Sequence, residues 1–221
     1  MLSKLVKTLR NALFPPSVAC VSCGREAVLN ERGMCPDCAA GTELFNDAPM
    51  IKDIDGYTAA YLYNDVSAKM VKRLKYNNAK YLAEPLARAI EIPKEWDIDA
   101  VAPIPLHYRR YSKRGYNQSE LIAKSLCEAK GLNLDTKLVV RRRDTKQQTR
   151  LSDAGRKRNV KGAFLADESC RGLNVLLADD VRTTGATLSE CAGALKAFGC
   201  AKVYAATVCC VDPNHRGGQF N

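Results

Sequence analysis

The stretch Val175-Leu-Leu-Ala-Asp179-Asp180-Val-Arg-Thr-Thr-Gly-Ala-Thr-Leu188 decides the fold of this chain. Its opening belongs to an apolar run over 173–178, which predicts a short buried β-strand that ends in the carboxylates of Asp179 and Asp180. A Thr-Thr-Gly turn follows, and the apolar spacing over 186–198 predicts a helix directly after it. We therefore expect a strand, a tight turn and a helix, with two acidic side chains where the strand ends.

The turn has the composition of a phosphate-binding loop. Backbone N–H groups at the start of a helix and the hydroxyls of Thr183, Thr184 and Thr187 would donate hydrogen bonds to an anion. Gly185 would let the backbone approach that anion closely. The two carboxylates cannot bind phosphate, but they suit ribose hydroxyls or a Mg²⁺ ion. The segment thus predicts a site for a phosphorylated sugar; the alternative is a threonine-capped surface turn, which the acidic pair disfavours.

Strands and helices alternate on both sides of this segment. Further strands are predicted over 57–63, 98–104 and 201–208, and further helices over 66–74, 81–92 and 119–130. Such alternation indicates an α/β domain over 55–212 with a mostly parallel sheet and helices on both faces. In sheets of this kind the ligand binds beyond the carboxyl ends of the strands.

Two Cys-x-x-Cys pairs, separated by eleven residues, precede the predicted sheet. They are formed by Cys20 and Cys23 and by Cys35 and Cys38. Four thiolates with this spacing are typical of a tetrahedral structural zinc site, in which the protein fills every position and none is left for catalysis. The alternatives, two disulfides or a redox pair, are disfavoured by reducing conditions and by the two close copies. We predict a zinc-ribbon module over 17–48.

The chain has the composition of a globular protein with reduced cysteines. Its 221 residues are 46% hydrophobic and 26% charged, which excludes a disordered chain, and no apolar run approaches the roughly 18–20 residues of a membrane span. Residues 1–16 predict an amphipathic helix and no secretory signal, because Lys4, Lys7 and Arg10 interrupt the apolar residues. We expect a cytoplasmic protein without stable membrane insertion, with a polar tail over 213–221.

The positive charge is concentrated in two stretches. The formal net charge is +10; ten basic and two acidic residues lie over 137–161, and four basic and no acidic residues lie over 107–114. These stretches indicate either a site for polyanions, such as nucleic acid or a phosphorylated metabolite, or a solvated basic face. Tyr108, Tyr111 and Tyr116 are interleaved with arginines, so they would either stack the bases of single-stranded DNA or pack at loop bases.

The predicted strand with its acidic pair and Thr-Thr-Gly-x-Thr turn resembles the PRPP (phosphoribosyl pyrophosphate) motif of type I phosphoribosyltransferases. The wider chain resembles the ComF family of competence and DNA-utilisation proteins, in which an N-terminal zinc ribbon precedes that fold. The other motifs that carry the resemblance are Pro103-Ile-Pro-Leu-His107, Arg114-Gly-Tyr-Asn-Gln118-Ser119 and Gln147-x-x-Arg150-Leu-Ser152-x-x-x-Arg156-x-x-Asn159-Val-x-Gly162-Ala-Phe164. Together with the four cysteines they extend it over nearly the whole chain.

The resemblance implies a role for each part of the site. Asp179 and Asp180 would be the catalytic pair that holds the ribose 2′- and 3′-hydroxyls, with Mg²⁺ bound together with PRPP. The residues implied for the 5′-phosphate are Arg182, Thr183, Thr184, Gly185, Ala186 and Thr187. Those implied for pyrophosphate and the mobile loops over it are Pro103, Ile104, His107, Arg114, Gln118, Arg150 and Arg156. In a transferase, Mg²⁺ and basic side chains would neutralise the pyrophosphate that departs from an oxocarbenium-like sugar.

Three functions stay open at this point. The first is an enzyme, a Mg²⁺-dependent phosphoribosyltransferase or a related hydrolase of PRPP, in nucleotide salvage or in DNA uptake and utilisation. The second is a non-catalytic competence factor that binds single-stranded DNA beside a helicase; the chain is not itself the motor, because it has no GxxxxGK[ST] motif. The third is a regulator that senses PRPP. No segment specifies whether the acceptor would be a base or an amine.

Overall fold

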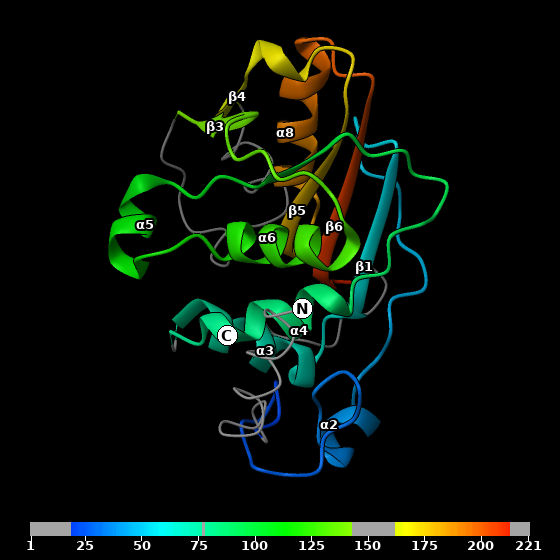
Figure 1. Ribbon diagram of the computed structural model, residues 1–221, viewed down its shortest axis with the longest axis vertical. Helices are drawn as coiled ribbons and strands as arrows, with labels where there is room; N and C mark the ends of the chain where they lie inside the picture. The colour runs from blue at the N-terminus through cyan, green and yellow to red at the C-terminus, as the bar shows by residue number, and fades with distance from the viewer. Residues whose placement is uncertain (1–18, 77, 143–161, 213–221) are drawn as a thin grey trace, which may run out of the picture.

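A computed structural model describes residues 19–76, 78–142 and 162–212 (Figure 1). Within them the main sheet has the strand order β1-β6-β5-β2, and every neighbouring pair is parallel. The strands are β1 (Gly56–Leu62), β2 (Ala100–Pro103), β5 (Asn174–Arg182) and β6 (Lys202–Cys210). The predicted α/β fold with a parallel sheet is confirmed. The helix predicted over 1–16, the tail over 213–221, Arg150 and Arg156 lie outside the described residues.

Helices cover both faces of this sheet, as predicted (Figure 1). One face carries α3 (Asp65–Tyr76), α4 (Ala83–Arg88) and α6 (Gln118–Lys130), and the other carries α8 (Ala186–Ala197) with the antiparallel pair β3 (Val139–Arg141) and β4 (Phe164–Ala166). The shorter elements are α2 (Pro36–Ala40), α5 (Tyr108–Arg114), η1 (Lys80–Leu82) and η3 (Glu168–Cys170). Among the helices in the described part of the chain, none is long and apolar enough to cross a membrane.

The side chains of β5 explain why both faces of the sheet are covered. Leu176 and Ala178 belong to the hydrophobic cluster with α3, α4 and α6, whereas Val175 and Leu177 belong to the cluster with α8. All four are fully buried. The strand therefore has a continuous apolar run and no polar alternation, as a parallel strand between two layers of helices requires.

The segment with the four cysteines packs directly on α3. We call residues 20–41 the cysteine module. Its residues Cys20, Val21 and Cys38 belong to the same hydrophobic cluster as Met70 and Leu74 of α3. The module and the sheet domain therefore share one core.

Short extended segments cover both edges of the main sheet. At the β1 edge, Leu44 forms an antiparallel bridge with Tyr61, and the Leu62 N–H donates to the Glu43 carbonyl at 2.9 Å. At the β2 edge, Val101 forms a parallel bridge to residue 134. The backbone of each outer strand is thus paired over part of its outer side.

Three elements differ from the sequence expectations. β5 continues past residue 178 to Arg182, because Asp179 and Arg182 still pair with strand β6. The helix expected over 81–92 consists of η1 followed by the shorter α4. The stretch after His107, expected to be a mobile loop, forms α5, because His107 accepts the Arg109 N–H at its start and Gly115 ends it with a φ of 79°.

Candidate functional site

The acidic pair lies near the end of β5, and its two side chains have different surroundings. The Asp180 side chain is 6% exposed and forms an ion pair with the ammonium of Lys75 from α3. Asp179 is partly exposed and accepts a hydrogen bond from Ser119 Oγ of α6 at 2.7 Å. Asp179 is therefore the accessible carboxylate of the pair, and Asp180 the internal one.

These surroundings raise the pKa of both Asp179 and Lys75. Burial, followed by the negative charge of Asp180, raises the pKa of Asp179 to about 7, although the hydrogen bond from Ser119 opposes the shift. Burial alone would lower the pKa of Lys75, but the attraction of Asp180 reverses this and raises it. Lys75 is thus held as a cation, and Asp179 changes its charge near neutral pH.

The predicted phosphate loop joins β5 to the start of α8. Gly185 precedes the helix with a φ of 75°, a conformation that L side chains rarely adopt, and a Cβ there would lie 3.2 Å from the side chain of Ile51. The Ala186 N–H donates to Thr184 Oγ1 at 3.4 Å. Thr183 and Thr187 are partly exposed. Their hydroxyls and the positive end of the helix dipole therefore lie directly after the acidic pair.

Arg182, which is predicted to contact phosphate, has its guanidinium in contact with the segment before β1 and with Tyr57. Its side chain is buried between the end of β5 and residues 49–51, where the guanidinium donates to the Pro49 carbonyl. The guanidinium carbon lies 4.5 Å from the centre of the Tyr57 ring. Within the described residues, Nε and Nη1 have no hydrogen-bond partner. The structure thus uses Arg182 to anchor the segment that leads from the cysteine module to β1.

The turn after β2 lies beside the acidic pair. The Ile104 N–H donates to the Ala178 carbonyl at 2.9 Å, directly before Asp179 in β5. The Ile104 carbonyl accepts from Asn117 Nδ2 at 3.0 Å. Pro103 and Ile104, both predicted for pyrophosphate, are therefore fixed between β5 and the first turn of α6.

The other described residues predicted for pyrophosphate lie in α5 and at the starts of α5 and α6. His107 is 5% exposed and caps α5. Arg114 donates to the side chain of Gln118, and its guanidinium carbon lies 5.4 Å from the centre of the Tyr76 ring. Arg114 and Gln118 thus form one polar group at the junction of α5 and α6.

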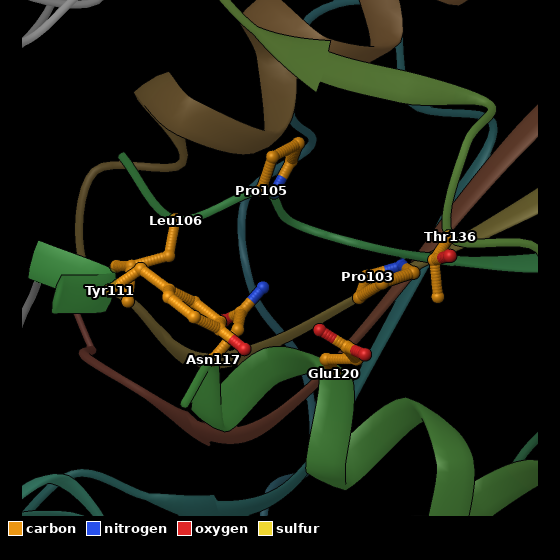
Figure 2. A pocket seen from close by; sticks show the side chains of 7 residues that line it. All are labelled: Pro103, Pro105, Leu106, Tyr111, Asn117, Glu120 and Thr136. Atoms are coloured by element: carbon orange, nitrogen blue, oxygen red, sulfur yellow. The ribbon is translucent and has the colours of Figure 1, made fainter. Parts of the chain in front are cut away.

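A cavity of about 170 Å³ opens beside the turn after β2 (Figure 2). Leu106 and Tyr111 form one side, Pro103 and Thr136 the opposite side, and Glu120 lies below them at the start of α6 (Figure 2). Pro105 and Asn117 complete the lining. Glu120 is its one charged residue, and Tyr111, Asn117 and Thr136 add uncharged polar groups, so the cavity offers both hydrogen-bond donors and acceptors.

The four predicted metal ligands come together in one cluster within the cysteine module. Their sulfur atoms all lie within 4.8 Å of one another, and Cys23 Sγ and Cys35 Sγ are 3.8 Å apart. Tetrahedral Zn–S bonds of about 2.3 Å separate the sulfurs by about 3.8 Å. The cluster therefore fits a structural metal such as zinc.

The thiols of this cluster differ in acidity. The backbone N–H of Arg25 contributes most to lowering the pKa of Cys23 to about 6, and the Arg25 guanidinium assists. Burial raises the pKa of Cys38 to about 12. Binding of a metal would therefore displace a proton from Cys38 at neutral pH.

Lys75 and the role of Ser119 were missed by sequence analysis. Lys75 directly follows the helix predicted over 66–74, and Ser119 begins the helix predicted over 119–130, so local spacing gives no reason to connect either with the acidic pair. The general rule that ligands bind at the carboxyl ends of parallel strands is the one signal that could have directed attention to the helix following β1.

Comparison with known proteins agrees with this geometry. Residues 79–219 match the family described as "Phosphoribosyl transferase domain". The "DNA utilization protein YhgH" of Salmonella typhimurium is 32% identical over 160 residues, which cover 66% of this chain and 68% of that protein. "Competence protein F" of Haemophilus influenzae is 30% identical over 141 residues, covering 59% and 62% of the two chains. "Competence protein ComFC" of Bacillus subtilis is 25% identical over 175 residues, covering 76% and 68%.

Among solved structures, the "allosteric regulatory enzyme of purine biosynthesis" matches with a TM-score of 0.37 and 20% identity, over 58% of this chain and 24% of that one. The family match covers more than half of the chain and includes the acidic pair and the loop after it. Taken with the named relatives and the cysteine cluster, it confirms the resemblance in the sequence: the chain belongs to the ComF family, whose fold contains a phosphoribosyl transferase domain.

Proposed function

We propose that this protein binds a phosphorylated ribose, PRPP or ribose 5-phosphate, and acts in DNA uptake or utilisation. The observation that carries the proposal is the position of Asp179. Its side chain is partly exposed, accepts a hydrogen bond from Ser119, and belongs to the end of β5 that leads into the threonine–glycine loop before α8. The names of the relatives, a DNA utilization protein and two competence proteins, support the biological role.

The proposed ligand would be divided among three parts of the site. Asp179 would accept hydrogen bonds from a ribose hydroxyl, and Thr183, Thr184 and Thr187 would bind the 5′-phosphate with the N–H groups of α8. A pyrophosphate group would lie at the turn formed by Pro103 and Ile104. Asp180, which we also predict to hold a ribose hydroxyl, would have to do so while it stays paired with Lys75.

If the ligand is PRPP, the reaction class is glycosyl transfer with loss of pyrophosphate. Mg²⁺ bound with PRPP would supply positive charge for the departing pyrophosphate. Of the acidic pair, Asp179 is the carboxylate that would hold the Mg²⁺ ion, because Asp180 already forms an ion pair with Lys75. The cavity beside Glu120 is a candidate for the acceptor, since it adjoins the same turn. We further propose that the cysteine cluster holds zinc with a purely structural role.

A second candidate function is binding of single-stranded DNA in the cytoplasm, without turnover, beside a helicase. It is favoured by the surface of α5, where Tyr108 is 66% and Tyr111 49% exposed. The guanidinium carbon of Arg109 lies 5.9 Å from the centre of the Tyr108 ring. Exposed aromatic rings beside arginines are the surface on which successive bases stack. A protein that only senses PRPP would use the same ribose-phosphate site.

Calorimetry with ribose 5-phosphate and with PRPP and Mg²⁺ tests the first proposal. We expect Asp179→Ala to abolish binding without unfolding the protein, and Glu84→Ala, an exposed change on α4, to leave binding unchanged. Absence of binding to the folded wild-type protein would contradict the ribose-phosphate assignment. Release of pyrophosphate from PRPP with a panel of bases and amines would then separate a transferase from a sensor.

Fluorescence anisotropy with a labelled oligothymidylate tests the second. Tyr108→Ala together with Tyr111→Ala should weaken binding by at least tenfold, because stacking contributes about 1–3 kcal/mol per base. The affinity should also fall steeply between 50 and 200 mM salt. An affinity that changes neither with these substitutions nor with salt would exclude DNA binding at α5.

A further inference from the structure

The Lys75–Asp180 ion pair connects the end of β5 to the helix α3. Asp180 has little access to solvent, and Lys75 has a side-chain exposure of 23%. The pair therefore lies mostly inside the protein, where a carboxylate without its cation is unfavourable. Displacement of the Lys75 ammonium would leave Asp180, the neighbour of Asp179 in the proposed site, without the cation of this ion pair.

The cysteine module holds α3 near both of its ends. Close to the start of the helix, Ser22 Oγ donates to the Val66 carbonyl at 2.9 Å. Close to its end, Arg73 Nη1 donates to the Cys20 and Val21 carbonyls at 2.6 and 2.9 Å. Both carbonyls belong to the turn that carries the first pair of cysteines.

Arg73 is two residues before Lys75, in the last turn of α3. The last turn of a helix lacks part of its backbone hydrogen bonds and opens easily unless tertiary contacts hold it. Here the contacts come from the cysteine module, because Arg73 is fixed to two of its carbonyls and Leu74 packs in the same cluster as Cys20. The metal-binding turn thus fixes the part of α3 that presents Lys75.

A second connection runs from the module to the same end of β5. The chain that leaves the module passes residues 49–51, where the Pro49 carbonyl accepts from the guanidinium of Arg182. Ile51 lies against Gly185 at the start of α8. Both routes out of the cysteine module therefore end at residues 180–185, which contain the internal carboxylate and the predicted phosphate loop.

We propose that Lys75 is a positioning residue for the ribose-phosphate site, and that the cysteine module sets this site by fixing the last turn of α3. The proposal rests on the proposed function for the identity of the ligand. The proposal assigns the cysteine module a role in ligand binding, although none of the residues assigned to the ribose-phosphate site belongs to the module. Loss of the metal or of the Arg73 contacts would release Lys75, free Asp180 to move, and displace Asp179 from the ribose.

The test compares affinities for ribose 5-phosphate by calorimetry in metal-loaded protein. Removal of the partners that orient ligand-binding groups changes affinity by about 10- to 100-fold in metal sites, and we expect a loss of this size for Lys75→Met and for Arg73→Met. Lys75→Arg should restore most of the affinity, because it keeps the cation. Arg88→Met, which removes an exposed arginine of α4, is the matched control and should have no effect.

The double variant decides whether the two residues act along one route. If Arg73 acts through Lys75, Arg73→Met should cause no further loss of affinity in the Lys75→Met protein. Losses that add in the double variant, or an unchanged affinity in Arg73→Met, would overturn the proposal. A Lys75→Arg variant as weak as Lys75→Met would overturn the role of the cation.

A measurement without ligand separates this proposal from the proposed function. In Arg73→Met, amide hydrogen exchange should accelerate at residues 72–76 and also at residues 179–182, but not in α8 beyond its first turn. This pattern would support the connection even if the wild-type protein binds neither ribose 5-phosphate nor PRPP, in which case only the proposed function fails. Faster exchange confined to α3 would contradict the connection.

Discussion

Replacing each carboxylate of the acidic pair by an amide should change stability in opposite directions. The pKa of Asp179 rises from 3.8 to about 7 on folding, because of burial and the charge of Asp180. At 1.36 kcal/mol per unit, this amounts to about 4 kcal/mol against the ionised folded protein. Asp179 keeps partial contact with water, so we expect about half, ~2 kcal/mol, to be recovered by Asp179→Asn at pH 8.

The pH dependence has a defined sign. A carboxyl group whose pKa is raised on folding favours the folded state at low pH, and this contribution is lost as the pH rises from about 4 through about 7. The advantage of Asp179→Asn over the wild type should therefore be largest near pH 8 and shrink towards pH 4. Asp180→Asn should instead lower the free energy of unfolding by about 3 kcal/mol, because it removes the ion pair that holds the mostly buried Lys75 ammonium.

Urea denaturation between pH 5 and pH 8 measures both effects. The one tryptophan, Trp96, is a suitable probe, because its ring is stacked on Tyr204 of β6 with the centres 4.5 Å apart. Midpoints of Asp179→Asn that lie below those of the wild type at pH 8, or a difference that does not vary with pH, would refute the reasoning. So would two amide variants with effects of the same sign.

Three further changes test the metal site, the loop and the core. Metal analysis should find one zinc per chain, and Cys38→Ser should lose it. The zinc affinity should rise with pH, because the Cys38 thiol gives up a proton when it binds the metal. A stably folded protein without metal would contradict the structural role of the zinc site. Gly185→Ala should cost about 2 kcal/mol, since the residue has a φ of 75° and a crowded Cβ position, whereas Gly131→Ala, with a φ of 71° and open space, should cost about 1 kcal/mol; equal losses in urea melts would exclude crowding at the loop. Leu176→Ala should lower the free energy of unfolding by about 2–5 kcal/mol, against little change for the 45% exposed Leu44→Ala.

Much of the fold could be predicted because its signals are local. The apolar run before Asp179, the glycine that starts α8 and the spacing of the cysteines each act within a few residues. The parallel sheet followed from the alternation of strands and helices, and the structure confirms it.

What could not be predicted depends on contacts between distant parts of the sequence. Arg182 was assigned to the phosphate loop from its neighbours, but its guanidinium meets a carbonyl from residue 49 and the ring of Tyr57. The ion pair of Asp180 with Lys75 joins two elements that no periodicity connects. The helix α5 was not predicted, because its basic sequence gives no helical pattern of apolar residues. The helix depends on the cap from His107 at its start and on the turn at Gly115 at its end.

The covered edges of the main sheet limit how this protein can recruit other molecules. On its outer side, β1 pairs at Tyr61 with Leu44, and β2 pairs at Val101 with the segment around residue 134. A peptide or a second copy of the chain therefore has no free strand to extend at these positions, so recognition by strand addition is disfavoured. A partner that binds at these positions would have to be recognised by side chains, where a single substitution can separate one partner from another.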